Sequence, residues 1–123
     1  MKISDAESRV MEVLWCAATA QSAEDIVAAV AEPQDWQEAT VKTLLNRLLK
    51  KRAIAAERDG RRYLYRPLVK RGDYVLAESE SLLDRLYGGR VAPLVAHFSE
   101  RSKLTKKDIA EIRALIEEID NES

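Results

Sequence analysis

Five polar side chains recur at helical spacing in the middle of the chain. They are Lys42, Thr43, Asn46, Arg47 and Lys50. Their spacing places them in one stripe of a helix that we predict over residues 39–51. Lysine and arginine can donate to guanine, asparagine can pair with adenine, and threonine can contact a thymine methyl group or a phosphate. The stripe therefore predicts a helix that binds the major groove of DNA, although a merely solvated polar face has the same spacing.

The predicted groove-binding helix has an apolar face opposite its polar stripe. That face consists of Val41, Leu44, Leu45, Leu48 and Leu49. Two helices are predicted before it, one over residues 4–17 and a short one that begins near Ser22 and ends before Pro33. Each begins with the spacing of a capping box, in which a serine and a later acid satisfy free backbone groups. These helices would supply the core that positions the polar stripe.

A β-hairpin is predicted directly after the groove-binding helix. Residues 54–58 and 61–66 are β-compatible runs that flank Asp59-Gly60, a strong signal for a tight turn. Arg61 and Arg62 lie at the predicted tip, where they are suited to phosphate or minor-groove contact. The alternative is a solvated hairpin that contacts nothing.

Three helices followed by a hairpin are the layout of a winged helix-turn-helix, here over residues 1–70. Residues 71–123 predict three further helices with apolar positions at helical spacing. The apolar positions are Leu82, Leu86, Ile109, Ile112, Ile116 and Ile119. About 50 residues are too few for an independent core, so we predict a dimerisation region that packs against a second copy. The alternative is that it packs back on the first domain.

The charge distribution supports a polyanion-binding face. The net charge of the whole chain is −1, yet residues 40–71 carry eleven bases against two acids, a local charge of +9. A basic block inside an acidic protein is the electrostatic footprint expected of nucleic-acid binding. A basic surface that only balances its acidic neighbours is the alternative.

The composition excludes several other functions. One histidine, His97, and one cysteine, Cys16, cannot form a metal cage, so we expect no metal site, no cofactor and no enzymatic activity. We expect Cys16 to be a small structural hydrophobe and His97 to lie on a helix surface or at a dimer interface. No intrachain disulfide, signal peptide or spanning segment is predicted, which indicates a soluble cytoplasmic protein without membrane insertion.

Several motifs resemble the penicillinase repressor family of the BlaI/MecI type. The resemblance covers nearly the whole chain, and the run TVKTLLNRL at residues 40–48 is its most specific part. The other matching stretches are residues 3–7, 10–15, 63–65, 81–89 and 94–98. The resemblance implies a mainly α homodimeric repressor, with an N-terminal winged helix for DNA and three C-terminal helices for dimerisation.

The resemblance also implies an operator and a signal. Family operators are inverted repeats with TACA and TGTA elements, and a membrane sensor metallopeptidase responds to β-lactam. The repressor is then cut in its dimerisation region, which removes the avidity of the two DNA-binding halves. The family's known cleavage is at an Asn-Phe bond, and the matching pair here is His97-Phe98.

Two further positions depart from the family pattern. Arg52 stands where many relatives have a helix-ending glycine, so a left-handed backbone there would cost roughly 1 kcal/mol. Gln37 stands where relatives often have a serine-like cap, which predicts a less well capped groove-binding helix.

The residues predict a dimeric winged-helix protein that binds DNA, and the resemblance implies a sequence-specific transcriptional repressor that acts as a homodimer on an inverted-repeat operator and is derepressed by proteolysis. Two alternatives stay open. One is a winged-helix regulator gated by a small ligand, and the other is a protein-interaction module that uses the basic face.

Overall fold

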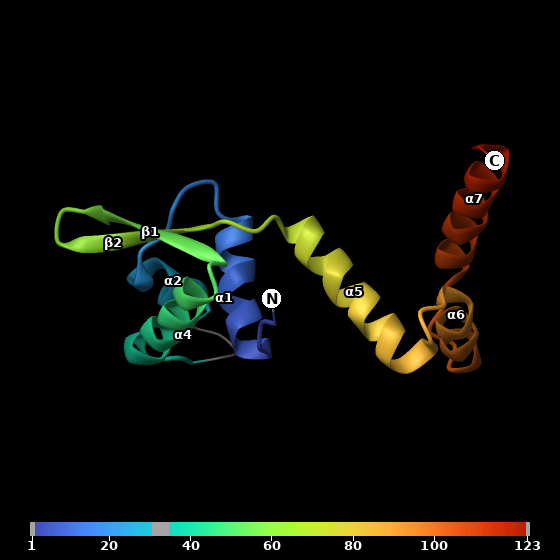
Figure 1. Ribbon diagram of the computed structural model, residues 1–123, viewed down its shortest axis with the longest axis horizontal. Helices are drawn as coiled ribbons and strands as arrows, with labels where there is room; N and C mark the ends of the chain where they lie inside the picture. The colour runs from blue at the N-terminus through green and yellow to red at the C-terminus, as the bar shows by residue number, and fades with distance from the viewer. Residues whose placement is uncertain (1, 31–34, 123) are drawn as a thin grey trace. The chain divides into compact units, whose positions relative to one another are not determined.

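The structure, a computed structural model, describes residues 2–30 and 35–122 of the chain (Figure 1). Its elements are α1 (Asp5–Cys16), α2 (Ala23–Ala29), α4 (Glu38–Lys50), β1 (Ile54–Asp59), β2 (Arg62–Pro67), α5 (Arg71–Tyr87), α6 (Val91–Glu100) and α7 (Lys106–Glu122). This order confirms the predicted succession of three helices, a hairpin and three helices. Contacts within the chain divide it into two compact units, Met1–Val75 and Leu76–Ser123.

The first two helices begin at the capping boxes that the sequence predicts. The Ser4 side chain accepts from the backbone N–H of Glu7, and the Glu7 side chain accepts from the backbone N–H of Ser4. Ser22 and Asp25 repeat this reciprocal arrangement at the start of α2. Such boxes satisfy backbone amides that the first turn leaves unpaired. The predicted boundary at Pro33 lies outside the described residues.

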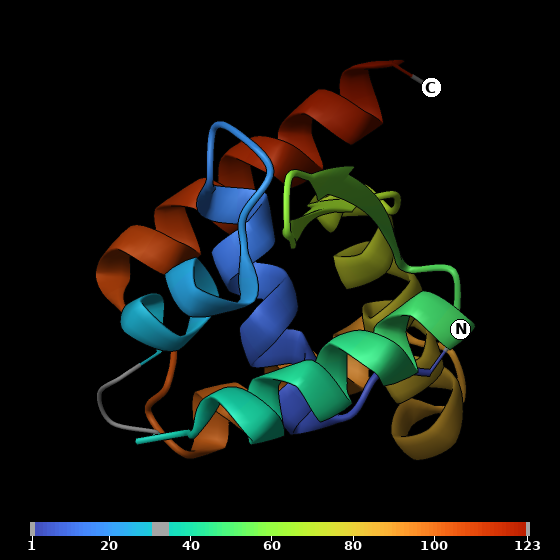
Figure 2. The ribbon, with the colours of Figure 1, turned by 90° about the vertical axis from the view of Figure 1, so that its left-hand side faces the viewer.

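Helix α4 packs its predicted apolar face into the core of the first unit. Val41, Leu44, Leu45 and Leu48 are buried, and Leu49 is partly buried. Their partners include α1 residues Val10, Met11 and Leu14 and α2 residue Ile26. Figure 2 shows α4 lying across α1, so that one face of α4 is turned away from the core.

Both ends of α4 depart from the usual capping pattern, as the sequence predicts. Gln37 makes no side-chain cap hydrogen bond, so the start of α4 has no side-chain cap. Arg52 follows its end with φ 62°, the left-handed region where a Cβ atom is strained. The Arg52 backbone N–H donates to the Leu49 carbonyl and that of Ala53 to the Leu48 carbonyl. Chain reversal into β1 therefore depends on a strained arginine.

The hairpin is antiparallel, and its turn lies one residue later than predicted. Asp59 pairs with Arg62 in the register, which leaves Gly60 and Arg61 as the turn, and Gly60 has φ 66°. The predicted turn at Asp59-Gly60 is therefore wrong by one position. The Asp59 carboxylate is 3.4 Å from the Arg62 guanidinium, so an ion pair adds to the pairing of these two strand residues.

The loop between α1 and α2 adds a short bridge to this sheet, which the sequence analysis missed. The backbones of Gln21 and Tyr65 donate to each other's carbonyls at 2.9 and 2.7 Å. Tyr65 is buried, so this bridge ties the base of the hairpin to the helical core.

The expectation for Cys16 is wrong, because its side chain is exposed at the C-terminal end of α1. The helical spacing turns Cys16 away from the core that its neighbours Val13 and Leu14 contact. Cys16 is therefore not a core hydrophobe.

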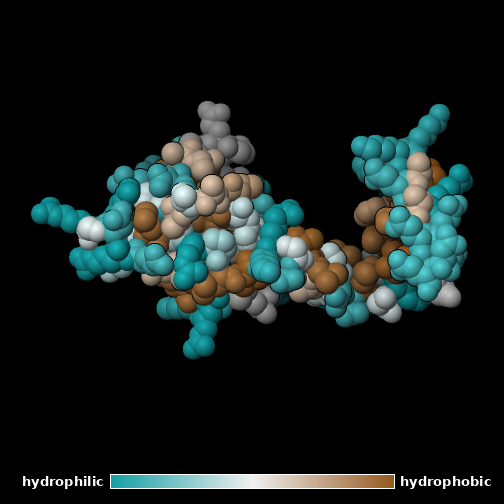
Figure 3. Space-filling view, turned by 90° about the horizontal axis from the view of Figure 1, so that it is seen from above, coloured by the Kyte–Doolittle hydropathy of each residue, from teal (hydrophilic) through white to brown (hydrophobic). Residues whose placement is uncertain are grey.

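The second unit consists of short amphipathic helices without a buried interior. No described residue of α5, α6 or α7 is buried. The capping box predicted at Thr105 and Asp108 is present at the start of α7. Apolar brown atoms are open to view along the C-terminal helices in Figure 3. Among the described residues, no helix is both long and apolar enough to cross a membrane.

Candidate nucleic-acid interface

The polar stripe of α4 lies on its exposed face. Lys42, Thr43, Asn46, Arg47 and Lys50 are all exposed, opposite the buried leucines. The fold thus brings five of the seven predicted DNA-binding residues together on one helix face. Among the described residues, Arg47 and Lys50 form no ion pair, so their charges are available to an external anion.

Thr43 has a restricted donor capacity. Its hydroxyl donates to the Ala39 carbonyl one turn earlier, at 3.0 Å. A threonine in this state presents its methyl group and its remaining lone pair outward. Thr43 is therefore suited to contact a thymine methyl group and has no free proton for a phosphate.

Lys42 carries a partner on its own helix. Its Nζ lies 3.3 Å from Oε1 of Glu38, one turn earlier in α4. The sequence analysis missed Glu38 as an interface residue, although the spacing of four between an acid and a lysine is a known signal for such a pair.

The remaining two predicted residues lie at the tip of the hairpin. Arg61 is in the turn itself and Arg62 begins β2, and both are exposed. Arg58, on β1, donates to the Gly60 carbonyl at 3.2 Å, and its guanidinium lies 5.8 Å from the centre of the Tyr63 ring. The Arg58 side chain thereby holds the turn that carries Arg61, a role that the sequence analysis did not assign.

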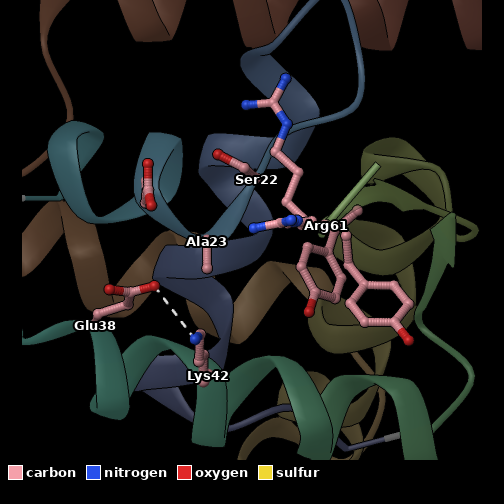
Figure 4. A pocket seen from close by; sticks show the side chains of 9 residues that line it. Ser22, Ala23, Glu38, Lys42 and Arg61 are labelled. Carbon is pink, nitrogen blue, oxygen red and sulfur yellow. Dashed lines mark ion pairs between the residues drawn. The ribbon is translucent and has the colours of Figure 1, made fainter. Parts of the chain in front are cut away.

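A pocket of about 340 Å³ lies between the exposed face of α4, the start of α2 and the hairpin (Figure 4). It is lined by Ser22, Ala23, Glu24, Glu38, Lys42, Arg61, Arg62, Tyr63 and Tyr65. Three cations and two carboxylates therefore share one concave surface. The pocket joins the helix residues of the predicted interface to the hairpin residues.

An ion pair between Lys51 and a buried carboxylate, outside this surface, holds the end of α4 in place. Lys51 Nζ contacts both carboxylate oxygens of Glu7, at 2.7 and 2.9 Å. Burial raises the pKa of Glu7, but hydrogen bonds from Lys51 and Ser4 outweigh it and leave the pKa below its ordinary value of 4.5. Lys51 belongs to the basic block, yet its charge is paired with a carboxylate of the protein itself.

The segment after the hairpin is also fixed to α1. The Trp15 indole donates to the Val69 carbonyl at 2.8 Å, and its ring lies 5.5 Å from that of Tyr74. Arg71 pairs with Glu12 at 3.1 Å. The first turn of α5 is therefore anchored on the first unit.

The residues predicted for dimerisation lie at the surface of the second unit. Leu82, Leu86, Ile109, Ile116 and Ile119 are exposed, and Ile112 is partly exposed. Exposed fractions of 65% for Leu86 and 64% for Ile119 are large for apolar side chains. A surface of this kind is typical of an interaction site.

The predicted cleavage residues lie within a helix. His97 and Phe98 belong to α6 and are exposed, and His97 Nδ1 is 3.1 Å from the Tyr87 hydroxyl. Within residues 2–30 and 35–122, no group of three His, Cys, Asp or Glu side chains could hold a metal ion.

The three-helix core, the exposed basic face of α4 and the hairpin define a winged helix-turn-helix protein of the DNA-binding class. The model of the penicillinase repressor family matches residues 3–118. The chain belongs to this family, which consists of transcriptional repressors and not of enzymes.

Individual relatives agree with this assignment. The penicillinase repressor of Bacillus licheniformis is 33% identical over 120 residues, which cover 98% of this chain and 93% of the relative. The methicillin resistance regulatory protein MecI of Staphylococcus aureus is 32% identical over 115 residues, 94% of this chain and 93% of the relative.

Two solved structures match the first unit's fold. The DNA binding domain of the repressor BlaI is 33% identical with a TM-score of 0.53, covering 59% of this chain and 88% of that chain. The monomeric form of Bacillus licheniformis BlaI, solved in complex with the blaP half-operator, is 32% identical with a TM-score of 0.51, covering 60% and 89%.

Proposed function

We propose that this protein is a cytoplasmic repressor that binds an inverted-repeat operator as a homodimer. The observation that carries the proposal is the exposed stripe on α4, next to the hairpin arginines. In a helix-turn-helix protein this helix enters the major groove and its outward side chains contact base edges. The related BlaI solved with a half-operator supports the same use of the fold here.

Each predicted residue has a role in this proposal. Lys42 and Arg47 donate to guanine, Asn46 pairs with adenine and Thr43 contacts a thymine methyl group. Lys50, Arg61 and Arg62 neutralise phosphates on either side of the groove. Phosphate contacts set the register of the protein on DNA, and the base contacts select the sequence.

In this proposal residues 71–123 form the dimerisation region, most of which is the second unit, Leu76–Ser123. Leu82, Leu86 and the four isoleucines of α7 become buried against a second copy. The exposed apolar side chains of α5 and α7 support this assignment, because an isolated unit with no buried residue has no core of its own.

Derepression follows from separating the two halves. A membrane sensor metallopeptidase would cut the chain at His97-Phe98, and the N-terminal product would retain one DNA-binding unit but lose α7 of the dimerisation region. The bond lies within α6, so α6 must unwind locally before a peptidase can bind it in an extended form. Incubation of the repressor with such a peptidase, followed by mass spectrometry, tests whether this bond is cut.

Fluorescence anisotropy on two duplexes of equal length tests the operator proposal. One duplex carries a TACA…TGTA inverted repeat and the other a scrambled sequence, and each is titrated at several salt concentrations. Binding to the repeat that is tighter by a factor of about 10³ or more supports the proposal. Equal and steeply salt-dependent binding to both duplexes would reduce the basic face to a non-specific electrostatic surface.

A further inference from the structure

The pocket between α4 and the hairpin contains a carboxylate that is paired with a lysine of the polar stripe. Glu38 lies in the first turn of α4 and pairs with Lys42 at 3.3 Å, as the dashed line in Figure 4 marks. The two side chains are 47% and 60% exposed. An ion pair this exposed contributes little to folding stability. The Glu38–Lys42 pair instead affects which groups Lys42 can bind.

Lys42 has two kinds of acceptor available on a DNA duplex. An ammonium on a flexible stem can reach a phosphate or a base edge, and it carries three donors. A guanine edge is a neutral acceptor, so Lys42 can donate to guanine and to Glu38 at the same time. A phosphate is an anion. If it contacts the same ammonium as Glu38, the two negative charges lie close together and repel each other.

Glu38 therefore penalises phosphate contact by Lys42 more than base contact. On operator DNA, Glu38 would hold the Lys42 side chain against α4 and direct its ammonium group toward a base edge. On non-specific DNA the register differs and the nearest acceptor is the phosphate backbone, which Glu38 disfavours. The same pocket contains a second carboxylate, Glu24, which has no ion-pair partner among the described residues.

We infer that Glu38 is a specificity-determining residue of this repressor, acting by holding Lys42 for a base edge and away from the phosphates. The inference rests on the proposed operator-binding function. From its charge alone, a carboxylate on the binding face would be expected only to weaken DNA binding. Glu38 would instead help to select the operator sequence.

The test is the ratio of affinities for the inverted-repeat and scrambled duplexes, measured for the full chain. Glu38→Gln should lower this ratio by about fivefold to tenfold, mainly by tightening binding to scrambled DNA. A loss of folding would weaken binding to both duplexes, whereas the proposed role tightens binding to scrambled DNA, so the two affinities separate the role in specificity from a structural one.

Two variants control for charge. Glu24→Gln removes a carboxylate from the same pocket without touching the lysine, so both affinities should rise together and the ratio should stay within about twofold. Asp5→Asn removes an exposed acid in the first turn of α1, outside the pocket, the basic block and the dimerisation region, and should change neither affinity.

A double-mutant cycle with Lys42→Gln gives the decisive result. If Glu38 acts through Lys42, Glu38→Gln should leave the ratio unchanged in the Lys42→Gln background. An equal fall in the ratio with and without Lys42 would overturn the inference, as would an unchanged ratio in Glu38→Gln alone. Wild-type protein that does not prefer the repeat would contradict the proposed function itself.

Discussion

The Nζ atom of Lys51 lies 2.7 Å from Oε1 of Glu7, and this contact joins the end of α4 to the start of α1. The Glu7 side chain is 3% exposed, whereas that of Lys51 is 35% exposed. The pair is separated by 44 residues in the chain, so it fixes the position of α4 through tertiary structure. Its carboxylate also caps α1 through Ser4.

Replacing Lys51 should therefore destabilise the fold. Lys51→Met leaves the Glu7 carboxylate buried beside an apolar side chain, and we expect the free energy of unfolding to fall by about 2 kcal/mol. Urea denaturation followed by circular dichroism measures this change. Lys107→Met, which breaks the exposed pair with Glu111, is the matched control and should cost less than about 0.5 kcal/mol. Equal costs for the two variants would contradict a structural role for the Glu7–Lys51 pair.

The same pair predicts a pH dependence of stability. The pKa of Glu7 is lower in the folded state than its ordinary value of 4.5, so the unfolded chain binds the proton more readily. The stabilisation is complete above about pH 4.5 and is lost as the pH falls through the lower folded value. Unfolding free energies measured between about pH 6 and pH 3 should fall less steeply for Lys51→Met than for the wild type. An equally steep fall in both proteins would place the responsible carboxylates elsewhere.

Arg52 provides a test of backbone strain at the end of α4. Because its φ is 62°, Arg52→Gly should raise the free energy of unfolding by up to about 1 kcal/mol. Arg52→Ala removes the same charge and keeps the Cβ atom, so it should give no such gain. Thermal denaturation of the three proteins separates the two effects. A gain of the same size in Arg52→Ala would assign the cost to charge and not to conformation.

Arg47 tests the assignment of base contacts. Arg47→Ala should weaken binding to the inverted repeat by about 1–3 kcal/mol and relax the base preference at one position in each half-site, if Arg47 pairs with guanine. Anisotropy titrations on a set of single-base variants of the repeat measure both effects. Lys2→Ala removes an exposed cation outside α4, the hairpin and the dimerisation region, and as the control it should leave binding unchanged. An equal loss on repeat and scrambled DNA would assign Arg47 to a phosphate.

The exposed apolar residues of the second unit test the dimer. Leu86→Asp combined with Ile119→Asp should convert the protein to a monomer in sedimentation velocity, because each charge would have to be buried in the interface. Leu68→Asp changes a residue of the first unit that is 51% exposed and should leave the dimer intact. A double variant that sediments as the wild type does would remove these two residues from the interface.

The features that sequence reasoning predicted correctly depend on local spacing. The capping boxes at Ser4 and Ser22 and the buried face of α4 follow from residues within four positions of one another. The exposed position of Arg47 follows in the same way. Helical periodicity decides which residues share one face, so these features can be predicted without the tertiary fold.

The features that it missed depend on contacts between distant segments. The Glu7–Lys51 pair and the Gln21–Tyr65 bridge join residues that only the tertiary fold brings together. The prediction for Cys16 was wrong because Leu14 is buried, whereas the side chain two residues later on α1 points away from the core. The turn lies at Gly60-Arg61, one residue later than predicted, because Asp59 pairs with Arg62 and the strand register decides where the hairpin reverses.

In the proposed function, the two DNA-binding units of one dimer contact the two half-sites of the operator together. The most direct test of this function compares the intact TACA…TGTA repeat with a duplex in which one half-site is scrambled, by anisotropy at one salt concentration. We expect the loss of one half-site to weaken binding by a factor of about 10² or more, with one dimer per intact site, because the second contact is intramolecular. Equal affinity for the two duplexes would show that the second DNA-binding unit adds nothing to operator binding, and would overturn the proposed function.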